Sequence, residues 1–378
     1  MASVLVYHVV GDLTVGKREV VEFIETETVE SAIREIGESA ERSISIWKRR
    51  SNNNVGSIES IEMREQRFVG MLNSLDIVSF LAKSKTHQDK AFNTPVSEVV
   101  VPNNSLLRLV DPGTRLIDAL ELMKQGVRRL LVPKTVAWKG ASKRFSIVYN
   151  GKWMKNNNVE TSSCGSNVAS NMNYWGSNNY KDTFCCLSRE DVLRFIIGCL
   201  GALAPLPLTS ITVLGAINSN YSYVESSSPA SEAIHEKNPQ GPSAVAVVVE
   251  MSRGEHKMIG EISACQLWKC DYIKAAWALA NVSAGEFVLG VVDQDNAGGK
   301  YRGRSAPLTC KTTTSLAAVM AQMLSHRASH VWVTQDDDDH LLAGVLGYAD
   351  VFAAVTKPPT SLLPAPAPAP NRTNFDGL

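Results

Sequence analysis

A hydroxyl and a carboxylate stand three residues apart in the segment Ser188-Arg189-Glu190-Asp191. At the start of a helix, Ser188 would cap free backbone N–H groups. Acidic side chains in the first turn would interact favourably with the positive end of the helix dipole. The same hydroxyl and amides also favour a phosphate. Asp191 can in addition accept charge-assisted hydrogen bonds from two neighbouring hydroxyls of a sugar. The segment is therefore interpreted either as a helix cap or as a contact to a phosphorylated ligand.

Three other segments repeat this spacing with departures. Asp76 and Asp350 keep the carboxylate, whereas Gln266 replaces it with an amide. At the first position, Asn73 offers an amide and Gly347 offers no side chain. These departures leave at most three sites for such a ligand.

Basic side chains come before two apolar runs that predict buried strands. Arg128 and Arg129 precede the first run, and His326, Arg327 and His330 surround the second. These side chains can be read in two ways, and both stay open. They could contact a phosphate, or they could lie in solvent at the end of a helix, where positive charge stabilises the helix dipole. The two histidines have a spacing that metal sites use, but the helix is expected to end between them. We therefore predict no metal site.

The elements that must position these residues form one unit of helix, strand, strand and helix, and this unit occurs four times. Residues 113–132 place apolar residues at i, i+3, i+4 and i+7 and then continue into an apolar strand. Residues 316–333 repeat the pattern without a gap, residues 29–47 more loosely, and residues 230–249 most faintly. A fourfold internal repeat predicts units that bury their apolar faces against one another.

The repeats resemble the CBS domain, the cystathionine-β-synthase motif. The resemblance is carried by GTRLIDALELMKQGVRRLLV at 113–132, LSRED at 187–191 and LAAVMAQMLSHRASHVWV at 316–333. The stretches YHVVGDLTVGK, GALAPLPLTSI and YRGRSAPLTCKT are similar to plant proteins of the CBSX type. The resemblance implies an α/β (α+β) fold of four βαββα repeats, paired into two Bateman modules within one chain or across a homodimer.

Five segments follow from this interpretation. Repeat 3 is degenerate, repeat 2 carries a long Asn/Ser-rich insertion, and a Pro/Ala-rich tail is expected to be disordered. The predicted limits are 16–84 for repeat 1, 95–200 for repeat 2 with its insertion at about 134–183, 206–282 for repeat 3, 303–357 for repeat 4 and 358–378 for the tail.

The family resemblance also implies a ligand. Clefts between CBS repeats can take adenine nucleotides, with a Ser or Thr placed three residues before an Asp that holds the ribose. Carried over to this chain, AMP, ADP or ATP is the expected ligand, S-adenosylmethionine is not distinguished from them, and no cofactor is obligatory. The implied nucleotide-binding residues are Ser188, Asp191, Asp76, Asp350, Arg128, Arg129 and His330.

Composition argues against several other classes of protein. The 38 basic residues balance the 38 acidic residues, so no global charge favours nucleic acid or an anionic membrane. The seven cysteines form no CxxC pair, which fits a reducing compartment and disfavours zinc, and Cys185-Cys186 is interpreted as core packing. The apolar stretch at 192–204 is too short to span a membrane. With no signal or transit peptide in evidence, we expect a cytoplasmic protein.

The sequence supports a regulatory protein more than an enzyme. It has no P-loop, no GxGxxG segment and no nucleophile elbow. The leading hypothesis is a non-enzymatic sensor that binds adenine nucleotides and regulates a partner protein such as a kinase or a redox enzyme. One alternative is a γ-like regulatory subunit of an AMP-activated or sucrose-non-fermenting-related kinase. Another is a scaffold with vestigial sites, and a third is an enzyme whose chemistry lies in the 134–183 insertion.

Overall fold

The computed structural model describes residues 3–39, 42–50, 61–84, 88–134, 147–149, 152–154, 184–235, 242–251, 254–290, 306–337 and 340–357. The predicted tail at 358–378 and most of the predicted insertion at 134–183 lie outside the described residues. Of that insertion, the structure describes a two-stranded hairpin of β6 (Ile147–Tyr149) and β7 (Lys152–Met154).

Four three-stranded sheets repeat one topology, and we name the parts of the chain that contain them units 1 to 4. In each unit the first strand pairs in parallel with the second, and the second pairs antiparallel with the third. The α+β fold predicted from the sequence is therefore confirmed. Unit 1 contains β1 (Phe23–Ile24), α2 (Val29–Glu38), β2 (Ser43–Trp47), α3 (Ile61–Gln66), β3 (Phe68–Asn73), α4 (Ser74–Lys83) and α5 (Gln88–Phe92).

The other units follow the same order of strands, and in unit 3 a 3-10 helix (Ala230–Ile234) stands where the others have their first α-helix. Unit 2 contains β4 (Leu107–Leu109), α6 (Leu116–Lys124), β5 (Arg129–Pro133), β8 (Phe184–Ser188) and α7 (Arg189–Gly198). Unit 3 contains β9 (Tyr223–Glu225), β10 (Ala244–Glu250), β11 (His256–Ser263), α8 (Ala264–Leu267), α9 (Tyr272–Asn281) and α10 (Ala284–Leu289). Unit 4 contains β12 (Thr309–Lys311), α11 (Leu316–Ser325), β13 (His330–Thr334), β14 (Leu342–Gly347) and α12 (Tyr348–Thr356).

Local sequence explains most of these elements. The apolar residues of α6 and α11 that recur at helical spacing are all fully buried. The unit of helix, strand, strand and helix predicts one closing helix, but in unit 3 this part of the chain is divided into α8 and α9. Asp271 causes the restart, since its carboxylate accepts hydrogen bonds from the backbone N–H groups of Ile273 and Lys274 at 3.1 and 3.2 Å.

The sheets pack face to face in two pairs. Units 1 and 2 share an apolar cluster that includes Trp47, Phe68 and Leu131. Units 3 and 4 share another that includes Val248 and Trp332. Paired sheets of this kind confirm the predicted Bateman modules, one made by units 1 and 2 and the other by units 3 and 4.

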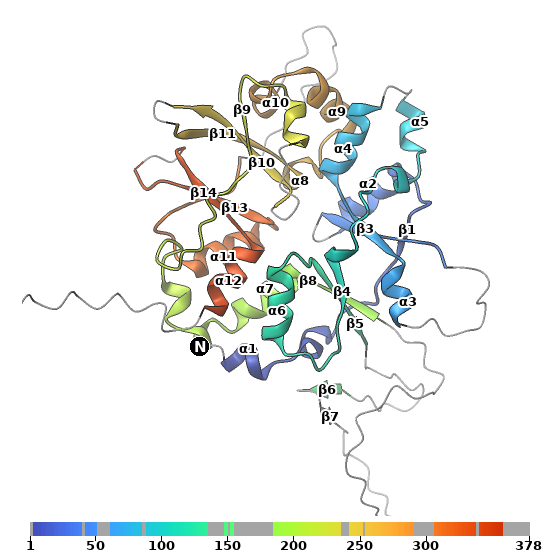
Figure 1. The fold of residues 1–378 in the computed structure, drawn as a ribbon, viewed down its shortest axis with the longest axis vertical. Coiled ribbons are helices and arrows are strands. Elements are labelled where there is room, and N and C mark those ends of the chain that lie inside the picture. The colour runs from blue at the N-terminus through green and yellow to red at the C-terminus, as the bar shows by residue number, and fades with distance from the viewer. Residues whose placement is uncertain are drawn as a thin grey trace, which may run out of the picture.

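The two modules join through their helices and close a ring. In one large core α4 of unit 1 packs on α9 of unit 3, and in the other α6 and α7 of unit 2 pack on α12 and α11 of unit 4. Figure 1 shows the four units around a common centre, with α4 beside α9 and α6 beside α12. Each unit therefore contacts one neighbour through its sheet and another through its helices.

Flanking segments tie each module together. The N-terminal helix α1 (Ser3–Tyr7) and the following 3-10 turn pack on unit 2, where the backbone N–H of Val10 donates to the carbonyl of Thr114 at 2.8 Å. Ile211, which precedes unit 3, donates in the same way to Thr314 of unit 4 at 2.9 Å. The predicted repeat limits stay a prediction. None of the described helices combines the length and the apolar character needed to cross a membrane.

Candidate functional site

A cavity of about 400 Å³ lies where the four units meet, and we call it the central cavity. Its walls come from the same two corners of each unit. One corner lies just before the middle strand of the sheet and contributes Arg42, Arg128, Ser243 and Ser329. The other lies at the start of the helix after the third strand and contributes Asn73, Glu190, Cys265 and Asp350. A volume of this size is in the range of small-molecule sites.

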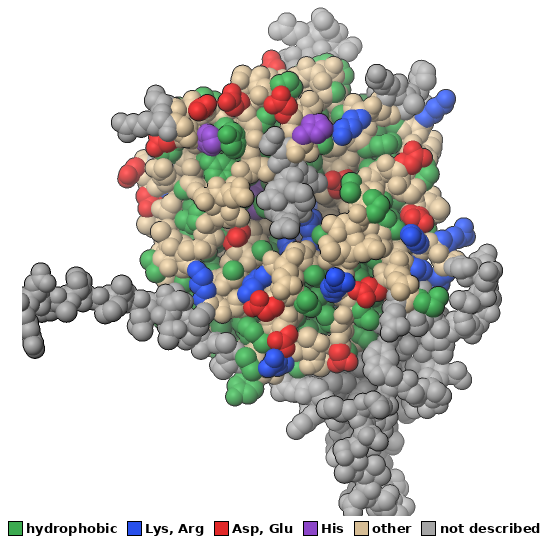
Figure 2. Space-filling view, in the orientation of Figure 1, with side chains coloured by type: hydrophobic (Ala, Val, Ile, Leu, Met, Phe, Trp, Pro, Cys, Tyr) green, Lys and Arg blue, Asp and Glu red, His purple; other side chains and the backbone are tan. Residues whose placement is uncertain are grey.

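The central cavity is lined by more positive than negative side chains. Five cations come from three units, namely Arg42, Lys124, Arg128, Arg189 and Arg327. Among the described residues that line the cavity, the only acids are Glu190 and Asp350. Elsewhere on the face shown in Figure 2, acidic and basic side chains are interspersed. The central cavity is thus a local site for an anion on a chain with no net charge.

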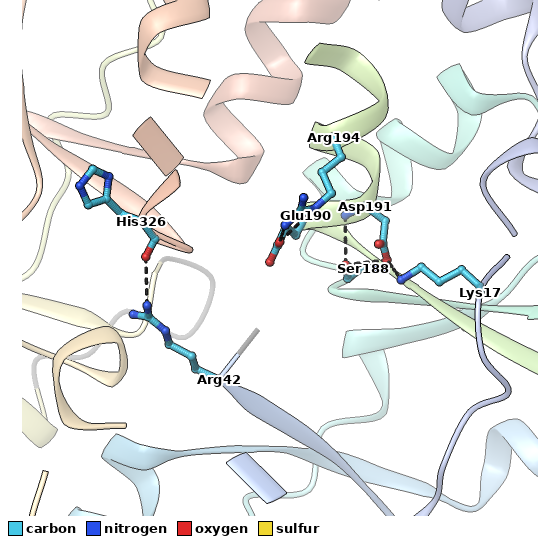
Figure 3. A network of polar contacts seen from close by, with 7 residues as sticks. All are labelled: Lys17, Arg42, Ser188, Glu190, Asp191, Arg194 and His326. Atoms are coloured by element: carbon cyan, nitrogen blue, oxygen red, sulfur yellow. Dashed lines mark hydrogen bonds and ion pairs between the residues drawn. The ribbon is translucent and has the colours of Figure 1, made fainter. Parts of the chain in front are cut away.

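Arg42 links unit 1 to units 3 and 4. Its guanidinium donates to the carbonyl of Cys265 at 2.9 Å and to that of His326 at 3.0 Å, and it lies 4.5 Å from the ring centre of Trp268. Figure 3 shows Arg42 reaching across the gap to His326. Arg42 and Arg327 both have left-handed backbones, with φ of 56° and 49°. Left-handed backbone is uncommon outside glycine and tends to collect at functional sites.

Arg189 and Glu190 are oriented by contacts within unit 2. The Arg189 guanidinium donates to the carbonyls of Val127 and Met123, both at 3.0 Å, which satisfies the C-terminal end of α6. Glu190 is buried and accepts from Arg194 at 3.1 and 2.5 Å. In Figure 3 the Glu190 carboxylate points toward the space that separates α7 from Arg42.

Asp350 is the one predicted carboxylate that lines the central cavity. Its Oδ2 accepts a hydrogen bond from the backbone N–H of Gly347 at 2.8 Å. Burial raises the pKa of Asp350, and the hydrogen bond from Gly347 and the positive charge of Arg189 oppose that rise only in part. Of the other predicted residues, only Arg128 joins it in the cavity lining.

Ser188 and Asp191 face away from the central cavity. The Ser188 hydroxyl accepts from the backbone N–H of Asp191 at 3.1 Å, and Asp191 accepts from the backbone N–H of Ser188 at 2.9 Å, which is a reciprocal cap on α7. Lys17 then donates to Asp191 at 2.5 Å. Figure 3 shows Asp191 turned toward Lys17, on the opposite side from Glu190. The capping interpretation therefore describes these two residues in this structure.

The remaining predicted residues are also outside the central cavity. Asp76 accepts from the backbone N–H of Asn73 at 3.1 Å and so helps to cap α4. Arg129 begins β5 and pairs with Ser188 in the sheet. His330 is buried and lies 2.8 Å from Glu261. The sequence predicts that the helix before His330 ends between His326 and His330; α11 stops at Ser325, with His326 as its C-cap, so the two histidines do not share a helix face. No group of metal-ligating side chains occurs within the described ranges.

A second cavity of about 790 Å³ lies between the sheets of units 3 and 4. Its lining includes Gln266, which is the amide found where the repeat pattern has an acid. Lys311 and His340 also line it. Lys311 is the only lysine or arginine among the described residues of this lining, so the second cavity is less suited to a polyanion than the central cavity.

The motif search missed Arg42 and Arg189 as cavity residues. A signal for Arg42 was present, because it directly precedes β2 as Arg128 directly precedes β5. Aligning the units at that corner would have paired the two arginines. Arg189 was considered only as part of the capping segment, and its carbonyl partners lie 62 and 66 residues away.

Comparisons with known proteins agree with this architecture. The CBS domain family model matches residues 303–357. The chain is 56% identical to the CBS domain-containing protein CBSX6 of Arabidopsis thaliana, with 97% of each chain covered. It is 24% identical to the Arabidopsis SNF1-related protein kinase regulatory subunit gamma-like PV42b, covering 92% of this chain and 94% of that one.

A solved structure shows the same fold. It is that of a protein from Methanocaldococcus jannaschii described as a putative archaeal homologue of γ-AMPK. The TM-score is 0.53 at 15% sequence identity, with 89% of this chain and 95% of that chain covered. Both modules are therefore included in the structural likeness.

Proposed function

The chain belongs to the CBS-domain family, as a CBS-pair regulatory protein related to CBSX-type proteins and γ-like kinase subunits, and from this premise we propose that it binds an adenine nucleotide in the central cavity. AMP, ADP and ATP share the chemistry that such a site would recognise. The bound nucleotide would act as a signal to a partner protein, and the chain itself would carry no catalytic activity.

The observation that carries this proposal is the cluster of five cations around one cavity. Phosphate oxygens accept charge-assisted hydrogen bonds from arginine, often two at a time. The Arg327 side chain has no hydrogen bond or ion pair within the part of the chain that the structure describes, so its charge is available to a ligand. Asp350 supplies a carboxylate in the cavity lining that can accept hydrogen bonds from the hydroxyl groups of a ribose.

Regulation would follow from the position of the central cavity. A ligand there contacts all four units, so it stabilises one relative arrangement of the two modules over others. The extent of that shift is limited by the difference in ligand affinity between the arrangements. A partner that binds both modules would sense the change.

Isothermal titration with AMP, ADP and ATP tests the proposal directly. We expect Arg128→Gln to weaken binding about 10- to 100-fold, because a hydrogen bond to a charged group contributes about 1.5–3 kcal/mol. Arg115→Gln is the matched control, since Arg115 lies in the same unit, outside the cavity, in an exposed pair with Asp118 at 2.8 Å. Equal affinities for the two variants would contradict the central cavity as the binding site.

A third variant separates the central cavity from the sequence motif. Asp191→Ala removes a cap and the contact with Lys17 but nothing in the central cavity. We expect nucleotide affinity to be retained and the free energy of unfolding to fall by about 1–2 kcal/mol. Loss of binding in this variant would instead assign a ribose contact to Asp191. Absence of heat with all three nucleotides would favour the scaffold with vestigial sites, to which the substitutions at Asn73, Gln266 and Gly347 point.

A second candidate function is that of a γ-like kinase regulatory subunit. It is favoured by the likeness to the gamma-like PV42b subunit over 92% of this chain. Affinity purification of the chain from its native tissue, followed by mass spectrometry, would recover kinase catalytic subunits if this function holds. Their absence from a preparation that retains other partners would count against it.

A further inference from the structure

Cys265 lies in the wall of the central cavity, where unit 3 meets unit 4. It is the second residue of α8 and is only half-buried. Its Sγ atom is 3.5 Å from the hydroxyl of Ser329, which directly precedes β13 of unit 4. Cys265 therefore lies within reach of a small reagent that enters the central cavity.

A line of hydrogen bonds runs from Cys265 into the core. The Ser329 hydroxyl lies 3.1 Å from Nδ1 of His330, and Nε2 of His330 lies 2.8 Å from a carboxylate oxygen of Glu261. The hydrogen bonds thus connect the sulfur to the hydroxyl, the hydroxyl to the imidazole, and the imidazole to the carboxylate. A nucleophile linked to a base that a third group orients is the general arrangement of an activated side chain.

Glu261 is fixed for this role by two further donors. The indole N–H of Trp332 donates to the same oxygen that contacts His330, at 2.5 Å, and the Ser263 hydroxyl donates to the other oxygen at 2.8 Å. Glu261 and His330 are only 4% and 3% exposed. A carboxylate held this way keeps the imidazole charged and in one orientation.

The charges around the sulfur favour the thiolate. Glu261 raises the pKa of His330 to about 10, although burial opposes the charge. The resulting imidazolium lowers the pKa of the Cys265 thiol against the opposing effect of burial. Arg42 holds the Cys265 carbonyl at 2.9 Å, and Arg327 lies in the same cavity. By contrast, burial raises the pKa of Cys185, Cys199, Cys270 and Cys310.

We propose that Cys265 is a redox modification site, at which hydrogen peroxide or a small organic hydroperoxide that enters the central cavity converts the thiolate to a sulfenic acid. The thiolate attacks one peroxide oxygen, so that an S–O bond forms and the O–O bond breaks. Sulfur is oxidised by two electrons, and the departing oxygen is reduced to the level of water. The His330 imidazolium donates the proton through the Ser329 hydroxyl, and it regains a proton from solvent.

Cys265 can be oxidised in this way whether or not the central cavity binds a nucleotide. The new oxygen on sulfur would lie among the residues that line the cavity. The modification would therefore change the contact between units 3 and 4 at the place where a ligand would sit.

The first test is the rate of alkylation of each cysteine by iodoacetamide in the reduced full-length chain, followed by peptide mass spectrometry. We expect the rate at Cys265 to rise less steeply between about pH 6 and about pH 8 than the rate at the other cysteines, because the pKa of its thiol is lowered. The rate at Cys199, an internal control of similar exposure, should rise about 10-fold per pH unit. Equal pH slopes for the two residues would overturn the proposal.

Two variants probe the relay itself. Glu261→Gln should slow alkylation of Cys265 at neutral pH about 10-fold or more while leaving Cys199 unchanged. Because loss of the buried Glu261 carboxylate can impair folding, Ser329→Ala provides a second variant that breaks the same line of hydrogen bonds. It should lower the yield of sulfenic acid with peroxide. An unaltered Cys265 rate in folded Glu261→Gln would contradict the role of the ion pair.

The second test uses hydrogen peroxide and a diketone probe for sulfenic acid. The expected result is labelling of Cys265 in the wild type at the lowest peroxide concentration that labels any cysteine. Cys265→Ser should lose that label. Labelling that begins at another cysteine, or that persists at the same level in Cys265→Ser, would overturn the assignment.

Discussion

At the scale of single residues, Asp191 shows how a binding motif and a helix cap can share the same side chains. Its carboxylate accepts from the Ser188 backbone at 2.9 Å and from Lys17 at 2.5 Å. Asp76 and Asp350 make the same backbone contact three residues upstream. The acid three residues after the N-cap position therefore indicates where a helix begins in every unit that keeps the acid. The two carboxylates differ in where they face. Asp350 lines the central cavity, whereas Asp191 contacts Lys17 outside it.

The buried pair of His330 and Glu261 should make stability depend on pH. The pKa of His330 is raised to about 10, so its contribution is complete below the ordinary histidine pKa of about 6.5 and declines as pH rises toward 10. The pKa of Glu261 is lowered, so its contribution is present above the ordinary carboxylate pKa and is lost in acid. We expect His330→Gln to lower the free energy of unfolding by about 3–5 kcal/mol near pH 6 and by less near pH 9.

Urea unfolding of wild type and variant at both pH values measures this difference. His326→Gln is the control, because the His326 side chain is exposed at the end of α11. A difference between wild type and His330→Gln that stays the same at the two pH values would mean that the pair is not ionised as described.

At the scale of the elements, Gly344 allows β14 to pass under a segment from the other half of its module. A Cβ atom there would lie 2.6 Å from the carbonyl oxygen of Asn218 and 2.6 Å from the side chain of Ile217. At Gly347, three residues later, the nearest atoms would be 3.6 and 3.7 Å away. A close contact therefore excludes a side chain at Gly344, whereas there is room for one at Gly347.

We expect Gly344→Ala to lower the free energy of unfolding by about 1–3 kcal/mol, because backbone or side chains must shift to make room. Gly347→Ala is the matched control and should change it by less than about 0.5 kcal/mol. Chemical denaturation followed by circular dichroism compares them. Equal free energies of unfolding for the two variants would show that the Asn218 segment can shift to make room at no measurable cost in stability.

At the scale of the whole molecule, the two modules should unfold together. The helix cores join unit 1 to unit 3 and unit 2 to unit 4, so each large core draws residues from both modules. Neither module can lose its helix layer without exposing the apolar face of the other. We expect one calorimetric transition, with the calorimetric enthalpy equal to the van't Hoff enthalpy.

Phe352→Ala sharpens this test, because Phe352 of α12 is fully buried in the core shared by units 2 and 4. It should lower the free energy of unfolding by about 3–5 kcal/mol and shift the single transition to lower temperature. Tyr7→Ala, at a side chain 74% exposed, should leave it in place. Two separated transitions in either the wild type or Phe352→Ala would contradict the closed ring.

Local sequence patterns are enough to locate the four units and to predict many of their helices and strands. Helical periodicity marked α6 and α11, apolar runs marked β5, β10 and β13, and the capping segments marked the start of α4 and α7. These signals act over a few residues, so they survive without knowledge of the fold. The division of α8 from α9 was missed, because a long apolar stretch concealed the cap at Asp271.

The tertiary structure alone decided which chemical groups face one another. Lys17 and Asp191 are 174 residues apart in sequence, Arg42 and Cys265 are 223 apart, and Glu261 and His330 are 69 apart. None of these pairs follows from local spacing. Packing within a module brings Lys17 to Asp191 and Glu261 to His330, and closing the ring of four units brings Arg42 to Cys265. Closing the ring also gathers Arg42, Arg128 and Asp350 around the central cavity. Repeats can be recognised one at a time, but a site shared by four of them exists only once all four are packed.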